Sequence, residues 1–165
     1  MCGIFGGFGP DEDWRSHSQY GQLIVHRGPD SSGFYYDQLA CLGNARLAIQ
    51  DLERGDQPFI SDDAQIVVVQ NGEIYNHEDL RNELKASGAR FRTTCDTEVI
   101  LVAYQTLGLQ FLSRLNGMFA IAIYDKRARC LHLARDRLGV KPLFICQRDG
   151  MATFGSEIKV VLATS

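Results

Sequence analysis

The residue best suited to covalent chemistry is Cys2, which directly follows the initiator in Met1-Cys2-Gly3-Ile4. Removal of Met1 would place a thiol and a free α-amine on the same residue. Free α-amines titrate near about 8 and thiols near about 8.5, so the amine can accept the thiol proton at neutral pH. Such a residue can act as a nucleophile without a separate histidine. Because a cysteine is more often a small buried apolar side chain, this hypothesis depends on the residues described next.

A possible oxyanion site follows the β-branched run over residues 66–69, where the sequence continues as Asn71-Gly72-Glu73. The side-chain amide of Asn71 can donate an N–H, and a glycine lets its own backbone N–H approach a ligand closely. Two such donors could stabilise a tetrahedral oxyanion. The alternative is a type I′ turn, for which Asn-Gly is a frequent signal. A helical pattern over residues 78–86 follows instead of the second strand that a hairpin would need.

Three charged residues are candidates for binding a charged substrate. Arg46 interrupts an apolar alternation, and its planar guanidinium could bind a carboxylate; the alternative is a solvated side chain. Asp96 could anchor an ammonium group, although Asp96 or Thr97 is also a natural N-cap. Arg27 lies in the turn-rich stretch over residues 26–33, which is either a surface loop or a loop that brings a cation near the thiol.

The hydrophobic pattern predicts antiparallel blocks of strands, with consecutive helices in the middle of the chain. Several strands are apolar on both faces, so two sheets must stack on each other and be covered outside by helices. The first helix has Ser16 as a plausible cap. The predicted fold class is α/β (α+β), a four-layer αββα sandwich of two stacked antiparallel sheets. We expect strands over residues 4–8, 34–36, 39–49, 64–70, 118–124, 130–134, 143–146 and 151–154, an extended piece from residue 57, and helices over residues 16–26, 78–86, 96–107, 111–115 and 158–162.

Composition excludes several classes of protein. The 165 residues fit one domain, and such a chain buries about 70% of its extended surface without needing disulfides or a metal. A net charge of −3 does not favour nucleic acid or an anionic membrane. No apolar run approaches the about 18 residues of a membrane span, and no signal peptide is recognisable. The five scattered cysteines lack disulfide or zinc spacing, so we expect a reducing cytoplasmic compartment, one reactive thiol and four buried structural ones.

Four motifs occur in a fixed order along the chain: Met1-Cys2-Gly3-Ile4, His26-Arg27-Gly28-Pro29-Asp30, Asn71-Gly72-Glu73-Ile74-Tyr75-Asn76 and the stretch over residues 134–143 that reads ARDRLGVKPL. As an ordered set they closely resemble the glutaminase domain of class II glutamine amidotransferases, above all the N-terminal half of glutamine-hydrolysing asparagine synthetases. The resemblance runs from Met1 to about Leu162. It implies an N-terminal-nucleophile hydrolase fold and the removal of Met1.

The resemblance also implies a role for each site residue. Cys2 would be the nucleophile that splits the side-chain amide of L-glutamine, through a γ-glutamyl thioester, into glutamate and ammonia. Asn71 and the Gly72 N–H would form the oxyanion hole. The remaining roles would be substrate binding by Arg46 at the α-carboxylate, by Glu73 and Asp96 at the α-ammonium and by backbone groups of Leu47 and Ile49, with Arg27 supporting the active centre.

The chain departs from these synthetases because it contains no glycine- and serine-rich phosphate loop of an ATP-pyrophosphatase domain. We therefore expect one glutaminase domain over residues 1–165, either excised from a longer protein or acting alone beside a synthetase subunit that accepts ammonia. No cofactor or metal is expected in this domain, with ATP and Mg²⁺ only in such a partner, and a homodimer is possible. The alternatives are an ammonia donor for a sugar, nucleotide or antibiotic precursor, and a non-catalytic glutamine-binding regulatory domain.

Overall fold

The computed structural model of the chain describes residues 2–10 and 12–164. Within these residues the strands form two sheets, and every pairing between neighbouring strands is antiparallel. Sheet A has the order β2-β3-β1-β9-β8, with β2 (Ser31–Tyr36), β3 (Ala40–Arg46), β1 (Gly3–Phe8), β9 (Met151–Gly155) and β8 (Phe144–Arg148). Sheet B has the order β4-β5-β6-β7, with β4 (Phe59–Ile60), β5 (Ile66–Ile74), β6 (Gly117–Asp125) and β7 (Cys130–Arg135).

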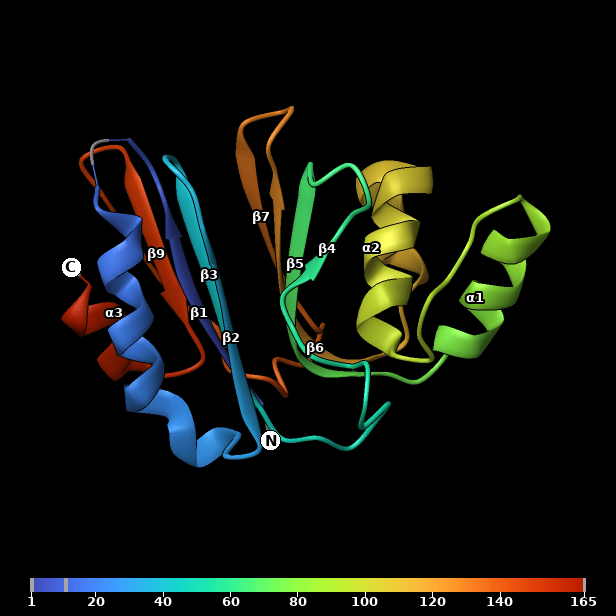
Figure 1. The fold of residues 1–165 in the computed structure, drawn as a ribbon, viewed down its shortest axis with the longest axis horizontal. Coiled ribbons are helices and arrows are strands. Elements are labelled where there is room, and N and C mark those ends of the chain that lie inside the picture. Colours follow the sequence, from blue (N-terminus) through green and yellow to red (C-terminus); the bar gives the residue numbers. More distant parts are fainter. Residues whose placement is uncertain (1, 11, 165) are drawn as a thin grey trace.

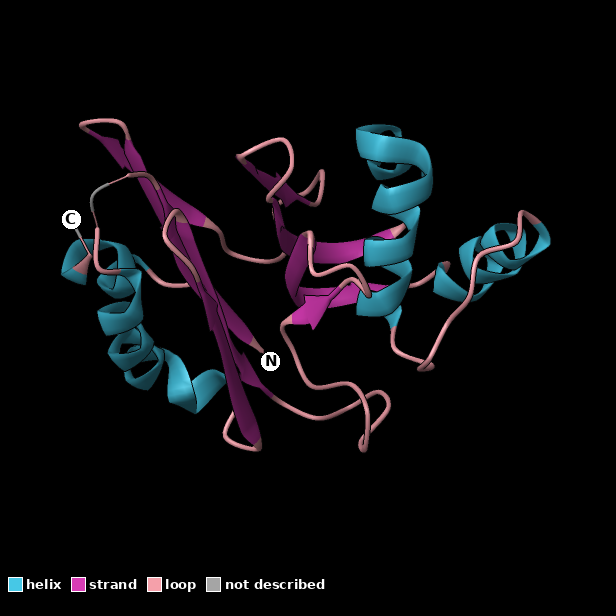
Figure 2. Cartoon of the chain, turned by 45° about the horizontal axis from the view of Figure 1, so that its top comes forward, coloured by secondary structure: helices cyan, strands magenta, loops and turns pink. Residues whose placement is uncertain are grey.

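The two sheets stack face to face and helices cover both outer faces, which confirms the predicted four-layer sandwich (Figures 1 and 2). The 3₁₀ helix η1 (Trp14–Arg27) and helix α3 (Ile158–Ala163) pack on sheet A. Helix α2 (Asp96–Leu107) packs on sheet B, and both α1 (His77–Ala86) and the 3₁₀ helix η2 (Gly108–Arg114) pack on α2. In Figure 1 α1 is accordingly the outermost element beyond sheet B.

Alternation along the strands builds the separate core layers. Val67 and Val69 of β5 face sheet A, and their neighbour Val68 faces α2. On β1, Ile4 joins the core between the sheets and Phe5 packs under η1. Successive side chains of a strand point to opposite faces, so a strand buried on both sides needs a continuous apolar run, as the sequence has here.

The predicted strand over residues 39–49 is shorter, because β3 ends at Arg46, and the predicted helix over residues 111–115 is the 3₁₀ helix η2. Two further predictions about local structure are corrected. The predicted helix over residues 16–26 is a 3₁₀ helix, and it starts at Trp14 without a side-chain cap from Ser16. Its glycine and β-branched residues, such as Gly21 and Val25, weaken the α-helix. The predicted strand over residues 64–70 continues to Ile74, because residues 66–74 all pair with β6. The Asn-Gly step therefore lies inside a strand, and the turn alternative is excluded.

The cysteines are less uniform than predicted. All five are free, but Cys130 and Cys146 are partly exposed, whereas Cys41 and Cys95 are buried. Burial raises the pKa of the Cys41 thiol to about 12 and, with the nearby Asp96 charge, that of Cys95 to about 11. These two thiols are therefore inert at neutral pH. No helix in the described part of the chain has the length and hydrophobicity needed to cross a bilayer.

Candidate active site

A cavity of about 140 Å³ opens where the starts of β1 and α2 meet the ends of β3 and β5. It is smaller than the roughly 300–1,000 Å³ pockets that hold drug-sized ligands, so it suits one small molecule. The structure brings eight of the nine predicted site residues to its wall, namely Cys2, Arg46, Leu47, Ile49, Asn71, Gly72, Glu73 and Asp96. They come from both sheets and from α2, and are separated by up to 94 positions in the sequence.

Cys2 is held at the cavity by the backbone just beyond β3. Its Sγ accepts the N–H of Leu47 at 3.3 Å and lies 3.5 Å from the carbonyl oxygen of Leu47, to which the S–H can donate. The side chain is partly exposed, unlike the buried thiol of Cys95, which also lines the cavity. Of the thiols at this wall, Cys2 is thus the accessible one. The predicted removal of Met1 concerns a residue outside the described part of the chain.

Asn71 and Gly72 sit side by side in β5 at the wall of the cavity. Gly72 has φ +154°, and a Cβ there would lie 2.1 Å from the carbonyl oxygen of Met118, so only glycine fits. Asn71 is buried, and its Nδ2 lies 3.4 Å from the Oγ of Ser156. Its Oδ1 is also buried and has no hydrogen-bond partner among the described residues. Asn71 therefore retains hydrogen-bonding capacity that this arrangement does not use.

Arg46 ends β3 with a buried guanidinium that holds the following loop. Nη2 donates to the carbonyl oxygens of Gln50 and Asp51 at 2.9 and 2.8 Å, and Nη1 donates to Oδ1 of Asp56 at 2.9 Å. Sequence reasoning predicted a carboxylate partner but did not foresee this loop. Because the Asp56 side chain is two-thirds exposed, water competes for its carboxylate, and the carboxylate is bound only weakly by the Arg46 guanidinium.

The two acids approach the cavity from different elements. Asp96 is buried at the start of α2, where its Oδ2 accepts hydrogen bonds from Gln70 Nε2 at 3.0 Å and from the Ile74 N–H at 2.9 Å. It does not cap its own helix, whose N-cap position is Cys95 without a side-chain cap, so the N-cap alternative is wrong. Glu73 Oε1 accepts a hydrogen bond from Gln50 Nε2 at 3.3 Å. The wall of the cavity thus carries two carboxylates and the guanidinium of Arg46, together with Lys141.

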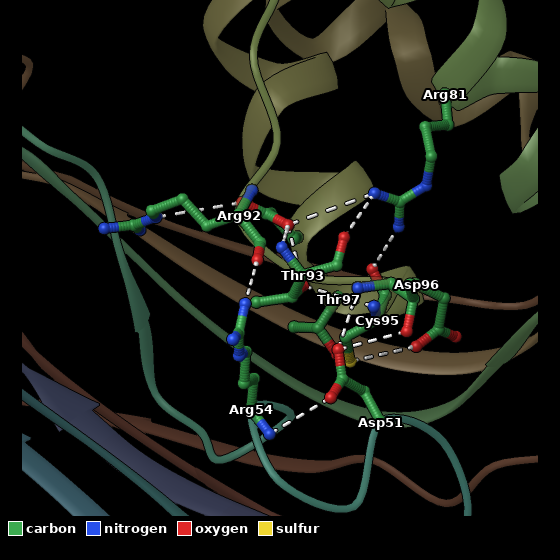
Figure 3. A network of polar contacts seen from close by, with 10 residues as sticks. Asp51, Arg54, Arg81, Arg92, Thr93, Cys95, Asp96 and Thr97 are labelled. Atoms are coloured by element: carbon green, nitrogen blue, oxygen red, sulfur yellow. Dashed lines mark hydrogen bonds and ion pairs between the residues drawn. The ribbon is translucent and has the colours of Figure 1, made fainter.

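A polar network fixes the segment that leads into α2 (Figure 3). Arg81 of α1 donates to the carbonyl oxygens of Thr93 and Cys95 at 2.7 and 2.9 Å. Asp51, from the loop that Arg46 holds, accepts the Thr94 N–H at 2.8 Å. Hydrogen bonds, first of all this one, lower the pKa of the Asp51 carboxyl. The network joins the Arg46 loop to the start of α2 and so positions the Asp96 backbone.

Arg27 is the predicted residue that the structure does not bring to the cavity. Its side-chain carbons lie beside Gly3, with Cδ at 3.1 Å and Cβ at 3.4 Å from where a Gly3 Cβ would be, and its Nε donates to Glu157 Oε1 at 2.6 Å. Although burial opposes the shift, hydrogen bonds from Lys159, Arg27 and His26 lower the pKa of Glu157 to about 2. The interpretation that the Arg27 cation acts on the thiol therefore lacks support here, and the Arg27 side chain packs on Gly3, the residue after Cys2.

Sequence reasoning missed two buried polar residues beside the site. Asp136 lies in the fourth quoted motif, and its carboxylate accepts N–H groups of Phe119, Val140 and Lys141 at 3.2, 2.8 and 3.0 Å. Despite the opposing effect of burial, these hydrogen bonds lower its pKa. Ser156 accepts the Ile4 N–H at 2.9 Å. An Asp before a Leu-Gly turn was a signal for the first, but Ser156 resembled an ordinary helix-start residue.

Comparison with known proteins identifies the family. Residues 1–165 match the glutamine amidotransferase domain family over their whole length. The chain belongs to this family.

Curated relatives of this glutamine amidotransferase domain are asparagine synthetases. The glutamine-hydrolyzing asparagine synthetase 1 of Bacillus subtilis is 40% identical over 168 residues, which cover 98% of this chain and 27% of that protein. A probable glutamine-hydrolyzing asparagine synthetase of Dictyostelium discoideum is 45% identical over 140 residues, covering 84% of this chain and 25% of that protein. The chain thus spans about a quarter of the length of these relatives.

Solved structures support the fold. The glutamine phosphoribosylpyrophosphate amidotransferase of B. subtilis matches with a TM-score of 0.79 at 24% identity, covering 96% of this chain and 42% of that one. A structure described as the allosteric regulatory enzyme of purine biosynthesis gives the same TM-score at 22% identity, with the same coverage. The expectation of an N-terminal-nucleophile fold is confirmed.

Proposed function

We propose that this domain hydrolyses the side-chain amide of L-glutamine to glutamate and ammonia. The observation that carries the proposal is the cavity itself, whose wall combines the accessible thiol of Cys2 with the donors of Asn71 and Gly72, one guanidinium and two carboxylates. Free glutamine carries one α-carboxylate, one α-ammonium and one amide, and these groups match that set. Membership of the glutamine amidotransferase family supports the same substrate.

The proposed reaction proceeds in two steps. With Met1 removed, the α-amine of Cys2 accepts the thiol proton, and the thiolate attacks the amide carbon of glutamine. Asn71 and the Gly72 N–H stabilise the tetrahedral oxyanion. The protonated α-amine of Cys2 then returns the proton to the departing amide nitrogen. That nitrogen leaves as ammonia, and a γ-glutamyl thioester remains on Cys2. Water attacks the thioester, and glutamate leaves with the thiol restored.

Substrate recognition rests on the charged α-groups. Arg46 binds the α-carboxylate in exchange for the exposed Asp56 carboxylate that it holds in the free domain. Glu73 and Asp96 bind the α-ammonium, and backbone groups of Leu47 and Ile49 line the substrate. A simple amide without α-groups would leave these charges unpaired in a confined site, which disfavours its binding strongly.

We further propose that the ammonia serves an amidation such as asparagine synthesis. The curated relatives are asparagine synthetases, of which this chain matches about a quarter. A synthetase domain or subunit would accept the ammonia and would be the part that uses ATP and Mg²⁺; the thiol, amine and N–H donors complete the glutaminase steps without a cofactor. The five free cysteines support a reducing, cytoplasmic setting.

The test is ammonia release from glutamine by the chain with Met1 removed, compared among three proteins. We expect turnover by the wild type, no detectable turnover by Cys2→Ala, and unchanged turnover by Cys146→Ala, whose side chain lies outside this cavity. Glutamine binding by the wild type without turnover would instead support the non-catalytic alternative. Turnover that survives in Cys2→Ala would contradict the mechanism.

A further inference from the structure

Ser156 links β1, the strand that directly follows the nucleophile, to Asn71, the residue proposed to donate to the oxyanion. It follows β9 and is completely buried. Its backbone N–H donates to the carbonyl oxygen of Ile4 at 2.8 Å, and its Oγ accepts the Ile4 N–H at 2.9 Å. Both backbone hydrogen bonds of Ile4, two residues after Cys2, are therefore made by Ser156.

The same hydroxyl is the hydrogen-bonding neighbour of Asn71. Ser156 Oγ lies 3.4 Å from Asn71 Nδ2, which is long for a hydrogen bond. In this orientation the amide oxygen of Asn71 is buried without a partner in the described structure. A serine hydroxyl has one hydrogen to donate and two lone pairs, and the Ile4 N–H uses only one lone pair. The hydroxyl hydrogen therefore needs an acceptor.

A half-turn of the Asn71 amide about its Cβ–Cγ bond gives a partner to both the Asn71 amide oxygen and the Ser156 hydroxyl hydrogen. The rotation exchanges oxygen and nitrogen, which have nearly the same shape. Ser156 then donates its O–H to Oδ1, and the NH₂ group takes the place of the partnerless oxygen on a side chain that lines the cavity. A buried donor held without a partner is prepared for a negative oxygen, which is the requirement of an oxyanion site.

We propose that Ser156 is a positioning residue that fixes the Asn71 amide with its nitrogen presented to the oxyanion. It acts through Asn71, and it is not among the described residues of the cavity wall. The inference rests on the proposed glutaminase function. It adds a hydroxyl just after β9 of sheet A that sets the orientation of a side chain on sheet B.

The test is a double-mutant cycle on the chain with Met1 removed, with kcat and KM for glutamine measured for each variant. We expect Asn71→Ala to lower kcat by about 10²–10³-fold, as for the loss of an oxyanion donor. Ser156→Ala should lower kcat by about 10–100-fold with KM changed less than about threefold, because Ser156 touches no α-group of the substrate. In the Asn71→Ala background, Ser156→Ala should change kcat by less than about twofold, because its target is gone.

Two controls separate positioning from loss of packing. Ser61→Ala also removes a buried hydroxyl that accepts a strand N–H at 2.9 Å, that of Ile66, away from the cavity; it should lower the melting temperature and leave kcat unchanged. Alkylation of Cys2 by iodoacetamide needs the thiol but no oxyanion site, so its rate should be equal in Ser156→Ala and the wild type. If Ser156→Ala does not fold, Ser156→Cys replaces the O–H with a weak donor, and the cycle is measured with it.

The outcomes distinguish this inference from the function on which it rests. A wild-type chain that releases no ammonia removes both. Two results with an active wild type overturn only the role of Ser156. One is a double mutant whose loss of kcat is the full product of the losses in the two single mutants. The other is a Ser156→Ala variant with a raised KM and an unchanged kcat. Slowed alkylation of Cys2 in Ser156→Ala would likewise show that the hydroxyl acts through β1 rather than Asn71.

Discussion

Two buried polar side chains near the cavity, Asn71 and Asp136, are treated very differently by their surroundings. The Asp136 carboxylate accepts three backbone N–H groups. The Asn71 amide has one long contact and a buried oxygen without a partner among the described residues. Both belong to motifs by which the family resemblance was identified. The contrast shows that a motif residue saturated by the backbone shapes the fold, whereas one left short of partners is free to bind a ligand.

Arg46 is intermediate between these two cases. Its guanidinium is well bonded, but its partners come from a single loop and include the exposed carboxylate of Asp56. A substrate carboxylate can replace such a partner, because the Asp56 side chain is already largely solvated and would give up one hydrogen bond to the guanidinium. The guanidinium can thus shape the loop in the free domain and bind substrate afterwards.

The largest effect is expected for a substitution that disrupts β5, the strand that carries Asn71. In Gly72→Ala the new Cβ would overlap the Met118 carbonyl oxygen at 2.1 Å, with φ at +154°. We expect the free energy of unfolding to fall by more than about 4 kcal/mol, with loss of activity. Urea unfolding measures this.

Gly88→Ala is the matched control for that substitution. Gly88 also has a positive φ, +94°, but no described atom lies within 4 Å of its Cβ position. Only backbone strain of about 1–2 kcal/mol remains. Equal losses in the two variants would show that the close approach of β5 to β6 is not what requires Gly72.

The contrast between Asn71 and Asp136 is tested most directly by a substitution of Asn71. Asn71→Ala should lower kcat by about 10²–10³-fold and lower the free energy of unfolding by no more than about 1.5 kcal/mol, because the side chain makes a single hydrogen bond, a long one with Ser156. Steady-state kinetics and urea unfolding on the same sample test both halves. A large loss of stability with normal kcat would assign Asn71 to the fold instead.

Asp136→Ala should give the opposite result. Three backbone N–H groups would lose their acceptor, and each unsatisfied buried donor costs about 1–3 kcal/mol. We expect the free energy of unfolding to fall by about 3 kcal/mol or more, with kcat of the folded fraction within about tenfold of wild type. Undiminished stability would mean that saturation by the backbone does not identify a structural carboxylate.

A smaller effect, confined to acid, is expected at Glu157, which is saturated by three side-chain donors. Its pKa is lowered to about 2 from 4.5, so its stabilisation is fully present above pH 4.5 and is lost as the pH falls through 2. The loss is at most on the order of 3 kcal/mol. Glu157→Gln should remove this part of the acid dependence, as seen in urea midpoints between pH 5 and pH 2. The same change of urea midpoint with pH in the wild type and in Glu157→Gln would contradict this prediction.

The layers of the fold could be predicted because runs such as residues 66–69 and 118–124 allow few other arrangements. Local geometry was harder. The path of β5 through Gly72 depends on pairing with β6, some 45 positions later in the sequence. The local strand propensity of residues carries no information on a partner so far away. For the same reason Asp96 resembled an N-cap, since its true partners, Gln70 and Ile74, lie on a distant strand.

The candidate site could be predicted where a residue type limits its chemistry, as for Cys2 and Arg46. Arg27 has an equally suggestive type, but strand alternation puts its contact, Gly3, on the other face of β1 from Cys2. Ser156 could not be predicted, because one hydroxyl before a short helix has no distinctive pattern. Its importance comes from two contacts, with Ile4 and Asn71, that only the folded chain creates.

The central claim is that the sulfur of Cys2 is the atom that attacks glutamine. The most direct measurement is peptide mass mapping after treatment with a glutamine-like diazoketone, with and without excess L-glutamine. The account predicts one adduct per chain, on a peptide that begins with Cys2, and protection by L-glutamine. Modification of Cys146 or Cys130 with Cys2 left intact, or modification that L-glutamine does not slow, would contradict it.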